Sequence, residues 1–428
     1  TTIRHCFYSQ RRRYITRRFD IWRWIHGWIL NIKEENLIFQ SLDDKNNCQA
    51  LYYDGNLRQE FAQHLSATWD YKLHHPDTNI DYANIYCGGM SLDNVCPEHL
   101  QEKWNDVVSK LKAFLVSFRE SKVDLSQLCF YDLVPDKFLV QYCHIKSEIT
   151  KSVFQNFLRP KNYRFLLDLY KLSEKIKLQK LNLDVTTLDM SSKSARLFRK
   201  KVDKYAPYIK YNIFGTKTGR LSTSPGSFPV MTFDKAHRQV LKPNNDCFLE
   251  LDFNGAELRT FLALSDMEQP EFDVHDWNRQ NVYDGTETRD EVKERFFAWL
   301  YNPKSSDHVT EQAYSKQKVL NKYWNGRAVK NPFGRTISAD AHHAMSYLIQ
   351  STCSDIVLRQ MIKLDQELQQ KQSFVAFCVH DEVVLDITDA ECELINDLVE
   401  HFSNTPLGKF GVNVKYGKSY GDMREWKQ

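Results

Sequence analysis

Two adjacent acidic residues interrupt a strongly apolar stretch near the C-terminal end of the chain. The segment SFVAFCVHDEVVLDI spans residues 373–387 and places His380, Asp381 and Glu382 between two runs of Val, Phe and Leu. Carboxylates in an apolar context repel each other and lose hydration, so something must compensate for them. The flanking runs predict two β-strands, and therefore a hairpin with the carboxylates at its tip. Metal ions or a tight turn would account for the charges.

A further acidic residue ends another apolar run. CFLELDF, residues 247–253, predicts a buried strand that ends at Asp252 and Phe253. A lone Asp in this place is often a strand-end cap or a turn residue. If this strand and the hairpin share one sheet, however, Asp252 and Asp381 lie close together. Two carboxylates so placed suit phosphoryl transfer by two Mg²⁺ ions, although many nucleases and other hydrolases also carry scattered Asp and Glu.

A helix with a cationic and aromatic stripe is predicted over residues 289–302, RDEVKERFFAWLYN, with Thr288 as its N-cap. The side chains that recur every four residues, and so share one slanting stripe, are Arg289, Lys293, Phe297 and Tyr301. An amphipathic helix with aromatic core contacts would show the same pattern. The functional interpretation is a nucleotide clamp, in which cations hold a triphosphate and rings face the base and sugar. His275, in FDVHDW, could add a phosphate donor.

Size and composition are those of a large globular protein. The chain has 428 residues, of which 42% are hydrophobic and 13% aromatic, so we expect about two to four subdomains and no wholesale disorder. No stretch approaches the roughly 18 apolar residues of a membrane span. The 10 cysteines show no paired spacing, which predicts reduced thiols in an intracellular protein. Basic clusters at residues 11–18 and 196–204 are either solvated faces or contacts to nucleic acid.

Elsewhere the patterns predict helices around a loop-rich centre. Residues 1–125 mix short apolar runs with loops and carry no motif. Residues 135–205 predict two long amphipathic helices, and residues 340–368 predict another long helix. Residues 212–236 are rich in Gly, Ser, Thr and Pro, which predicts loops or short strands.

Five segments together resemble the family A DNA polymerases, the family of bacterial DNA polymerase I and its phage relatives. TGRLSTSPGSFPVM (218–231) resembles the T-G-R-L-S-S segment that precedes the palm, and DFNGAELRT (252–260) resembles motif A, D-Y-S-Q-I-E-L-R. RDEVKERFFAWLYN fits motif B, R-x3-K-x3-F-x3-Y-G, and HDE (380–382) is motif C. LIQSTCSDIV (348–357) resembles the helix written Q-G-T-A-A-D. The resemblance covers the C-terminal half well, the helical region from about residue 130 moderately and residues 1–125 hardly at all.

The resemblance implies an α+β fold, a right-hand polymerase with an antiparallel-sheet palm, helical fingers and a helical thumb. An N-terminal α/β-type region would precede it, for which a reduced or degenerate exonuclease-like domain is one interpretation. The implied ranges are 1–125 for the N-terminal region, 126–210 for the thumb, 211–270 and 338–428 for the palm, and 271–337 for the fingers. The compact form suggests a phage, virus or plasmid source.

The resemblance assigns the metal ligands first. Asp252 and Asp381 would ligate two catalytic Mg²⁺ ions, for which Mn²⁺ can substitute. The carbonyl of Phe253 would complete one coordination shell. Glu382 would lie nearby among the catalytic groups in a supporting role.

The resemblance also assigns the nucleotide and DNA contacts. Arg289, Lys293 and His275 would bind the incoming triphosphate, and Lys293 is a candidate proton donor to the leaving pyrophosphate. Phe297 and Tyr301 would shape the pocket for the nascent base pair, and Glu257 would reject a ribose 2′-hydroxyl. The residues expected at the minor groove or the primer end are Arg220, Gln350 and His380.

Three positions depart from the family pattern. Gly255 replaces the glutamine of motif A, Asn302 replaces the glycine after the motif B tyrosine, and Ser351 replaces the glycine after Gln350. These changes affect pocket shape rather than charge, so we expect catalysis to persist and fidelity or analogue tolerance to differ. The first 150 residues contain no Asp-x-Glu, the metal-binding opening of a proofreading exonuclease, so we expect no 3′→5′ exonuclease activity.

The function that this resemblance implies is template-directed DNA polymerisation, in which dNTPs extend a primer 3′ end. The expected partners are primer-template DNA and dNTPs, without a membrane, and the expected state is a monomer. We expect an intracellular location, in the host cytoplasm for a viral source. The alternatives are a single-subunit RNA polymerase, a catalytically inactive DNA-binding relative and a two-metal nuclease.

Overall fold

Two compact units make up the computed structural model, Thr1–Leu158 and Arg159–Gln428. The structure describes residues 37–42, 50–73, 75, 79–125, 128–202, 204–302 and 304–426. The basic cluster at residues 11–18 lies outside these ranges. Among the helices that are described, none combines the length and the apolar character that crossing a membrane requires.

Small sheets and a helical layer form the N-terminal unit. A parallel sheet contains β1 (Leu37–Ile38), β5 (Leu65–Thr68) and β6 (Asp81–Tyr82), and an antiparallel sheet contains β2 (Gln40–Ser41), β3 (Leu51–Tyr53) and β4 (Asn56–Arg58). The helices are α2 (Ala83–Tyr86), α3 (Leu92–Val95), α4 (Gln101–Glu120) and α5 (Asp136–Asn156). Trp104 and Val107 of α4 share one core with Phe138 and Tyr142 of α5. Helices and partly parallel strands agree with the α/β-type region expected here.

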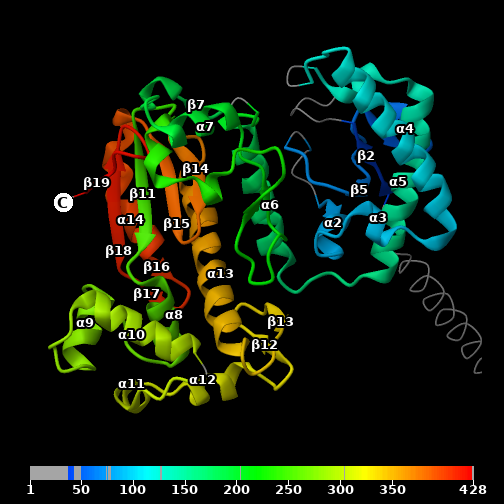
Figure 1. Cartoon of the computed structure of the whole chain (residues 1–428). Helices are drawn as coiled ribbons and strands as arrows, with labels where there is room; N and C mark the ends of the chain where they lie inside the picture. The colour runs from blue at the N-terminus through cyan, green and yellow to red at the C-terminus, as the bar shows by residue number, and fades with distance from the viewer. Residues whose placement is uncertain are drawn as a thin grey trace, which may run out of the picture. The chain divides into compact units, whose positions relative to one another are not determined.

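An antiparallel sheet of five strands is the centre of the C-terminal unit (Figure 1). Its order is β14 (Phe374–Val379), β15 (Glu382–Ile387), β11 (Cys247–Phe253), β18 (Val412–Gly417) and β19 (Arg424–Glu425). The predicted hairpin of β14 and β15 and the predicted strand β11 are confirmed, and β11 and β15 are direct neighbours. The sheet therefore brings the two predicted acidic segments together.

A long helix, α13 (Ala344–Glu367), packs against most of the C-terminal unit. It contacts α6 (Tyr163–Leu178), α8 (Ala256–Leu264), α14 (Ile395–Ser403) and β14, and α14 packs on β11 and β18. Because it has neighbours on several sides, buried residues occur all around α13 rather than on one stripe. The predicted helix over residues 340–368 is confirmed, but it begins at Ala344 because Asp340 accepts a hydrogen bond from the backbone N–H of His343 (2.9 Å) in a preceding turn.

Four further helices, one of them the predicted nucleotide clamp, and a hairpin lie between α8 and α13 in the sequence. They are α9 (Val274–Asn281), α10 (Arg289–Tyr301), α11 (His308–Ala313), α12 (Lys316–Tyr323), β12 (Ala328–Lys330) and β13 (Thr336–Ser338). The predicted N-cap of α10 is confirmed, because Thr288 and Glu291 bond each other's backbone N–H in a capping box. Phe296 and Trp299 anchor the opposite side of α10 in an aromatic core.

The remaining elements of the C-terminal unit are short. They are α7 (Lys193–Val202), β7 (Asn182–Leu183), β8 (Tyr211–Asn212), β9 (Ser222–Thr223), β10 (Leu241–Lys242), β16 (Asn404–Thr405) and β17 (Gly408–Lys409). Most of the basic cluster at residues 196–204 lies on α7.

The two long helices predicted over residues 135–205 are confirmed as α5 and α6, but they belong to different units. The division after Leu158 falls between them, inside the range 126–210 expected for the thumb. Helix α5 packs with α4 and the N-terminal strands, because its apolar face is covered by the core of that unit. The boundaries of the thumb, palm and fingers stay a prediction.

Candidate active site

Asp252 and Glu382 lie opposite each other on neighbouring strands. The register of β11 and β15 pairs Asp252 with Glu382, and the register of β11 and β18 pairs Asp252 with Asn413. Side chains of directly paired residues stand on the same face of a sheet, so these three groups form one row across three strands. The amide of Asn413 donates a hydrogen bond to Asp252 Oδ2 (3.2 Å).

Asp381 occupies the turn that joins β14 to β15. Val379 and Glu382 form the last pair of the hairpin, which leaves His380 and Asp381 as the turn. His380 is exposed and has a φ of 56°, a left-handed conformation that only a few per cent of non-glycine residues adopt. The strained turn therefore carries two predicted site residues next to the row that contains Asp252.

Hydrogen-bonding and cationic groups partner some of these acidic residues and leave others without a cation. Lys415 Nζ lies 2.7 Å from Glu250 Oε1, and the hydroxyl of Tyr420 donates a hydrogen bond to Glu382 Oε2 (3.2 Å). Within the described parts of the chain, Asp252 has no cationic partner, and Asp381 has neither a hydrogen bond nor an ion pair through its side chain. The two residues that were predicted to hold metal are thus among the acidic groups without a cation, and Glu382 has only a hydroxyl partner among the described residues.

The charge of Asp252 is poorly supported by its surroundings. Burial, followed by the negative charges of Asp381, Glu382 and Glu250, raises the pKa of Asp252 to about 7, against the opposing effect of the Asn413 amide. Burial and the charge of Glu250 also raise the pKa of Glu382. A positive charge placed beside Asp252 and Asp381 would relieve this repulsion.

A pocket of about 310 Å³ joins the end of the sheet to the cationic helix. Its lining residues are Asp252, Phe253, Asn254, Gly255, Ala256, Glu257, His275, Arg289, Lys293, Phe297, Asp381 and Asn413. Eight of the thirteen predicted site residues are in this lining, although they come from four separate segments of the sequence. The other five, which lie outside the lining, are Arg220, Tyr301, Gln350, His380 and Glu382.

Arg289 and Lys293 present their charges differently. Arg289 makes two bonds to Asp273, from Nε to Oδ1 (3.1 Å) and from Nη2 to Oδ2 (2.8 Å). The bonds from Arg289 help to hold the pKa of Asp273 well below its usual range, although burial acts in the opposite direction. Lys293 is exposed, and within the described part of the chain no carboxylate pairs with it. One cation is therefore held rigidly, while the other can turn toward a ligand.

His275 lies beside these cations as a buried imidazole. It is 1% exposed, and neither of its ring nitrogens has a hydrogen-bond partner within the described residues. Burial, followed by the charge of Arg289, lowers the pKa of His275 to about 4, so the ring is neutral at physiological pH. An unsatisfied buried N–H that lines a pocket is a donor for a ligand oxygen.

Gly255 explains one departure from the family pattern. It has a φ of 63°, and a Cβ at this position would lie 2.3 Å from Val274 Cγ1 and 3.1 Å from His275 Nε2. A larger residue would therefore force the start of α9 and the ring of His275 away from the pocket. The glycine that stands in place of the motif A glutamine therefore lies where α9 packs closely against the chain.

Glu257 is held from two sides. One oxygen accepts a bond from Arg220 Nη2 (3.1 Å), and the other accepts a bond from the hydroxyl of Tyr301 (2.7 Å). The ring of Tyr301 stacks on Phe297 with a centroid distance of 6.0 Å and an interplanar angle of 3°. The structure therefore links Arg220 and Tyr301 to the pocket through Glu257, although neither lines it. Gln350 is half-buried on α13.

Several residues that hold the site in place were not predicted from the sequence. Asp273 is the N-cap of α9 and accepts bonds from the backbone N–H groups of His275 and Asp276 (2.9 Å each). An aspartate directly before a helix is a recognisable cap, and this signal could have identified Asp273. Its ion pair with Arg289 depends on the tertiary fold. Arg259 is fully buried and donates bonds to the carbonyls of Pro270 and Phe272 (2.8 Å each), which fixes the loop before Asp273.

An ion pair to a buried aspartate supports the loop that carries Arg220. Arg335 Nη2 lies 2.6 Å from Asp355 Oδ1 on α13, and Asn331 donates a further bond to Asp355 (2.7 Å). Gly219 has a φ of 82°, and a Cβ there would lie 2.5 Å from the guanidinium carbon of Arg335. The glycine of the T-G-R segment is therefore required by the close approach of Arg335.

The donor set suits a divalent metal ion. No group of three or more His, Cys, Asp and Glu residues in the described chain is placed to hold a metal ion. The pocket instead offers carboxylates from Asp252 and Asp381 and the backbone of Phe253, and oxygen is the donor that Mg²⁺ prefers. Mg²⁺ is commonly held by one or two carboxylates together with substrate phosphates. A bound cation would stabilise the charged form of Asp252, whose pKa burial and the neighbouring carboxylates raise.

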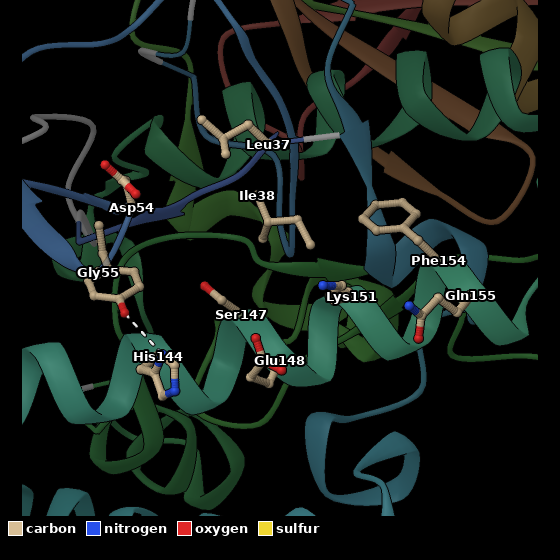
Figure 2. A pocket seen from close by; sticks show the side chains of 11 residues that line it. Leu37, Ile38, Asp54, Gly55, His144, Ser147, Glu148, Lys151, Phe154 and Gln155 are labelled. Atoms are coloured by element: carbon tan, nitrogen blue, oxygen red, sulfur yellow. Dashed lines mark hydrogen bonds between the residues drawn. The ribbon is translucent and has the colours of Figure 1, made fainter. Parts of the chain in front are cut away.

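A second pocket, of about 510 Å³, lies in the N-terminal unit (Figure 2). Side chains of α5, including His144, Glu148 and Lys151, line it together with Leu37 and Ile38 of β1. The hydroxyl of Tyr52 and Nδ1 of His144 are hydrogen-bonded to each other (3.2 Å). Because this pocket mixes charges of both signs with apolar side chains, its lining indicates no particular chemistry.

Comparisons with known proteins agree with the geometry of the smaller pocket. Residues 299–428 match the family model described as DNA polymerase family A. The structure is similar to that of the POL domain of Pol1 from M. smegmatis in complex with DNA primer-template and dNTP, with a TM-score of 0.52 and 14% sequence identity. The similarity covers 67% of this chain and 76% of that chain, and it confirms the expected α+β polymerase fold. No curated protein sequence matches the chain. Residues 299–428 therefore resemble DNA polymerase family A, and the chain shares the fold of a polymerase domain.

Proposed function

We propose that this chain extends the 3′ end of a DNA primer with dNTPs under the direction of a template. The observation that carries the proposal is the pocket in which two carboxylates, without a cationic partner among the described residues, face Arg289, Lys293 and His275. A nucleoside triphosphate needs both the cations and the carboxylates of this pocket. The cations bind its phosphates, and the carboxylates bind the metal that phosphoryl transfer requires. A two-metal nuclease would use the carboxylates but would not need the cationic helix.

The carboxylates of Asp252 and Asp381 and the carbonyl of Phe253 would hold divalent metal, with Mg²⁺ as the proposed ion and Mn²⁺ as a substitute. When bound, the metal supplies Lewis-acid stabilisation to the phosphoryl group and its attacking and leaving oxygens. The hydrogen bond from the hydroxyl of Tyr420 holds Glu382 in its place beside Asp252.

The side chains of α9 and α10 would position the triphosphate. Arg289 is preorganised by Asp273 to face phosphate oxygens, and His275 donates one neutral N–H. Lys293 is mobile enough to follow the leaving pyrophosphate and donate a proton to it. Phe297 offers a ring face to the nascent base pair.

Glu257 would discriminate between deoxyribose and ribose. Arg220 and Tyr301 hold both of its oxygens, so the carboxylate has little freedom to move away from an added 2′-hydroxyl. Arg220, Gln350 and His380 would contact the minor groove or the primer end. Primer-template DNA and dNTPs are the proposed partners, while the monomeric state, the intracellular location and the phage or plasmid type stay predictions.

We also propose that the chain lacks 3′→5′ proofreading. In the N-terminal unit Lys146, which is 8% exposed, places its Nζ 3.9 Å from Asp70 Oδ2. Nearby, Gln40 is 1% exposed and donates bonds to Thr150 Oγ1 (3.2 Å) and Ser147 Oγ (3.4 Å). The ammonium of Lys146 and the amide of Gln40 indicate side chains that stabilise the folded core. A metal-dependent hydrolytic site would instead need carboxylates that are free to bind metal. Degradation of an end-labelled primer that disappears on mutation of residues 1–125 would contradict this proposal.

Primer extension tests the proposed polymerase. The wild-type chain should extend a labelled primer with dNTPs and not with NTPs, and Asp252→Asn and Asp381→Asn should abolish extension while DNA binding persists. Asp397→Asn, an exposed aspartate on α14, is the matched control. Extension with NTPs alone would favour the RNA polymerase. Unchanged extension by Asp381→Asn would overturn the assigned site, and DNA binding without any extension would favour an inactive relative.

A further inference from the structure

A half-buried lysine lies beside the acidic row of the palm sheet, outside every motif used above. Lys415 is on β18, directly opposite Glu250 of β11. Its Nζ lies 2.7 Å from Glu250 Oε1, and the side chains of Lys415 and Glu250 are 40% and 5% exposed, respectively. The carboxylate that accepts this hydrogen bond from Lys415 therefore has almost no access to water.

Glu250 shares its face of the sheet with Asp252, because the two residues are two positions apart on one strand. The rows are adjacent, with Lys415 opposite Glu250 in one and Asn413 opposite Asp252 in the next. Without Lys415, Glu250 would be an additional buried carboxylate without a cation beside the proposed metal ligands. Such a group also attracts a divalent cation.

We propose that Lys415 is a positioning residue for the metal site, and this inference rests on the function proposed above. Its ammonium binds Glu250, so that Glu250 does not compete with Asp252 and Asp381 for a divalent cation. Lys415 thereby lowers the affinity for the cation and restricts where the cation binds. Glu382, the other acidic group of the row, is restrained separately by the hydroxyl of Tyr420.

The chain contains a matched ion pair for comparison. Lys409 Nζ lies 2.7 Å from Glu400 Oε2, the same separation as in the pair of Lys415 and Glu250. The Lys409 and Glu400 side chains are 63% and 53% exposed, so water screens that pair. Removing Lys409 should therefore change the charge of the protein equally without affecting the metal site.

Titration of the full chain with Mn²⁺, without DNA or dNTP, tests the proposal by the electron paramagnetic resonance signal of free Mn²⁺. At about pH 8, Lys415→Gln should bind Mn²⁺ about 5- to 10-fold more tightly than wild type, because a nearby positive charge is lost. The double variant Glu250→Gln with Lys415→Gln removes one charge of each sign, so its affinity should return to within about twofold of wild type. Lys409→Gln should match wild type.

Two results would overturn the role of Lys415. An Mn²⁺ affinity that is unchanged or weaker in Lys415→Gln would contradict it, even if the variant unfolds at a lower temperature as a purely structural lysine predicts. A double variant as tight as the single variant would exclude action through Glu250. Asp381→Asn separates this proposal from the metal site itself, because unchanged Mn²⁺ binding in that variant would refute the site and not only Lys415.

Discussion

Two partly buried carboxylates, Asp70 in the N-terminal unit and Asp252 in the C-terminal unit, have different partners. In the N-terminal unit, Asp70 has the ammonium of Lys146 beside it, at 3.9 Å. In the C-terminal unit, Asp252 receives only an amide bond from Asn413 among the described residues, and its pKa rises to about 7. A lysine in the fold neutralises its partner permanently, whereas a carboxylate without one can bind a cation that exchanges. The difference separates a carboxylate that stabilises the fold from one that is available for chemistry.

The largest effect should follow from removing a carboxylate that has no fixed cation. Asp252→Asn should reduce primer extension about 10⁴-fold, because the site loses the several kcal/mol of stabilisation that a bound metal supplies. Single-turnover extension measures this loss, and Asp397→Asn serves as the control. If Asp252→Asn kept more than about a tenth of the activity, Asp252 would belong with Asp70 as a structural carboxylate.

The next effect concerns the cation that has no fixed carboxylate, Lys293. Lys293→Ala should lower kcat/KM for dNTP about 10³-fold, through loss of phosphate binding and of proton donation, while the affinity for primer-template stays unchanged. Steady-state extension and a fluorescence binding assay provide the two measurements, with exposed Lys318→Ala of α12 as the control. Equal loss of dNTP use and of DNA binding would show that Lys293 has a general structural role.

His275 extends the comparison to a neutral group whose ring nitrogens have no hydrogen-bond partner in the part of the chain that the structure describes. Its pKa of about 4 in the folded protein lies below the ordinary value near 6.5, so the unfolded chain binds the proton first as the pH falls. This contribution to the free energy of unfolding is present above about pH 6.5 and is lost toward pH 4, by about 3 kcal/mol.

Denaturant unfolding at several pH values measures this contribution. His275→Gln should flatten the pH dependence between about 6.5 and 4, whereas exposed His99→Gln should leave it unchanged. An unaltered slope in His275→Gln would mean that His275 has the same pKa in the folded and the unfolded chain.

The smallest effect should come from the carboxylate that has a fixed partner. Lys146→Met should lower the free energy of unfolding by about 1 to 2 kcal/mol, because Asp70 loses its partner, and should leave primer extension unchanged. Lys110→Met, which breaks an exposed pair with Asp106 at 2.7 Å, is the control for surface charge. Impaired primer extension in Lys146→Met would show that the pair of Lys146 and Asp70 also contributes to activity, which would contradict the distinction between Asp70 and Asp252.

Much of the candidate site could be predicted from short segments. The stripe from Arg289 to Phe297 follows from helical periodicity, and the hairpin around Asp381 follows from two apolar runs, so local patterns were sufficient for both. The motif order also indicated that Asp252 joins them, and the sheet confirms that β11 and β15 are neighbours. The separation of α5 from α6 could not be predicted, because two amphipathic helices in succession do not reveal which core covers each one.

The sequence by itself determined which residues of this protein can do chemistry, since residue type and strand or helix period are local properties. Only the tertiary structure decided which of these residues have a hydrogen-bond or ion-pair partner. Lys415 and Glu250 are separated by 165 positions, and Asn413 and Asp252 by 161, yet the register of β11 and β18 sets each pair face to face. Charge compensation depends on such contacts across the sheet, and no pattern within a single strand contains them.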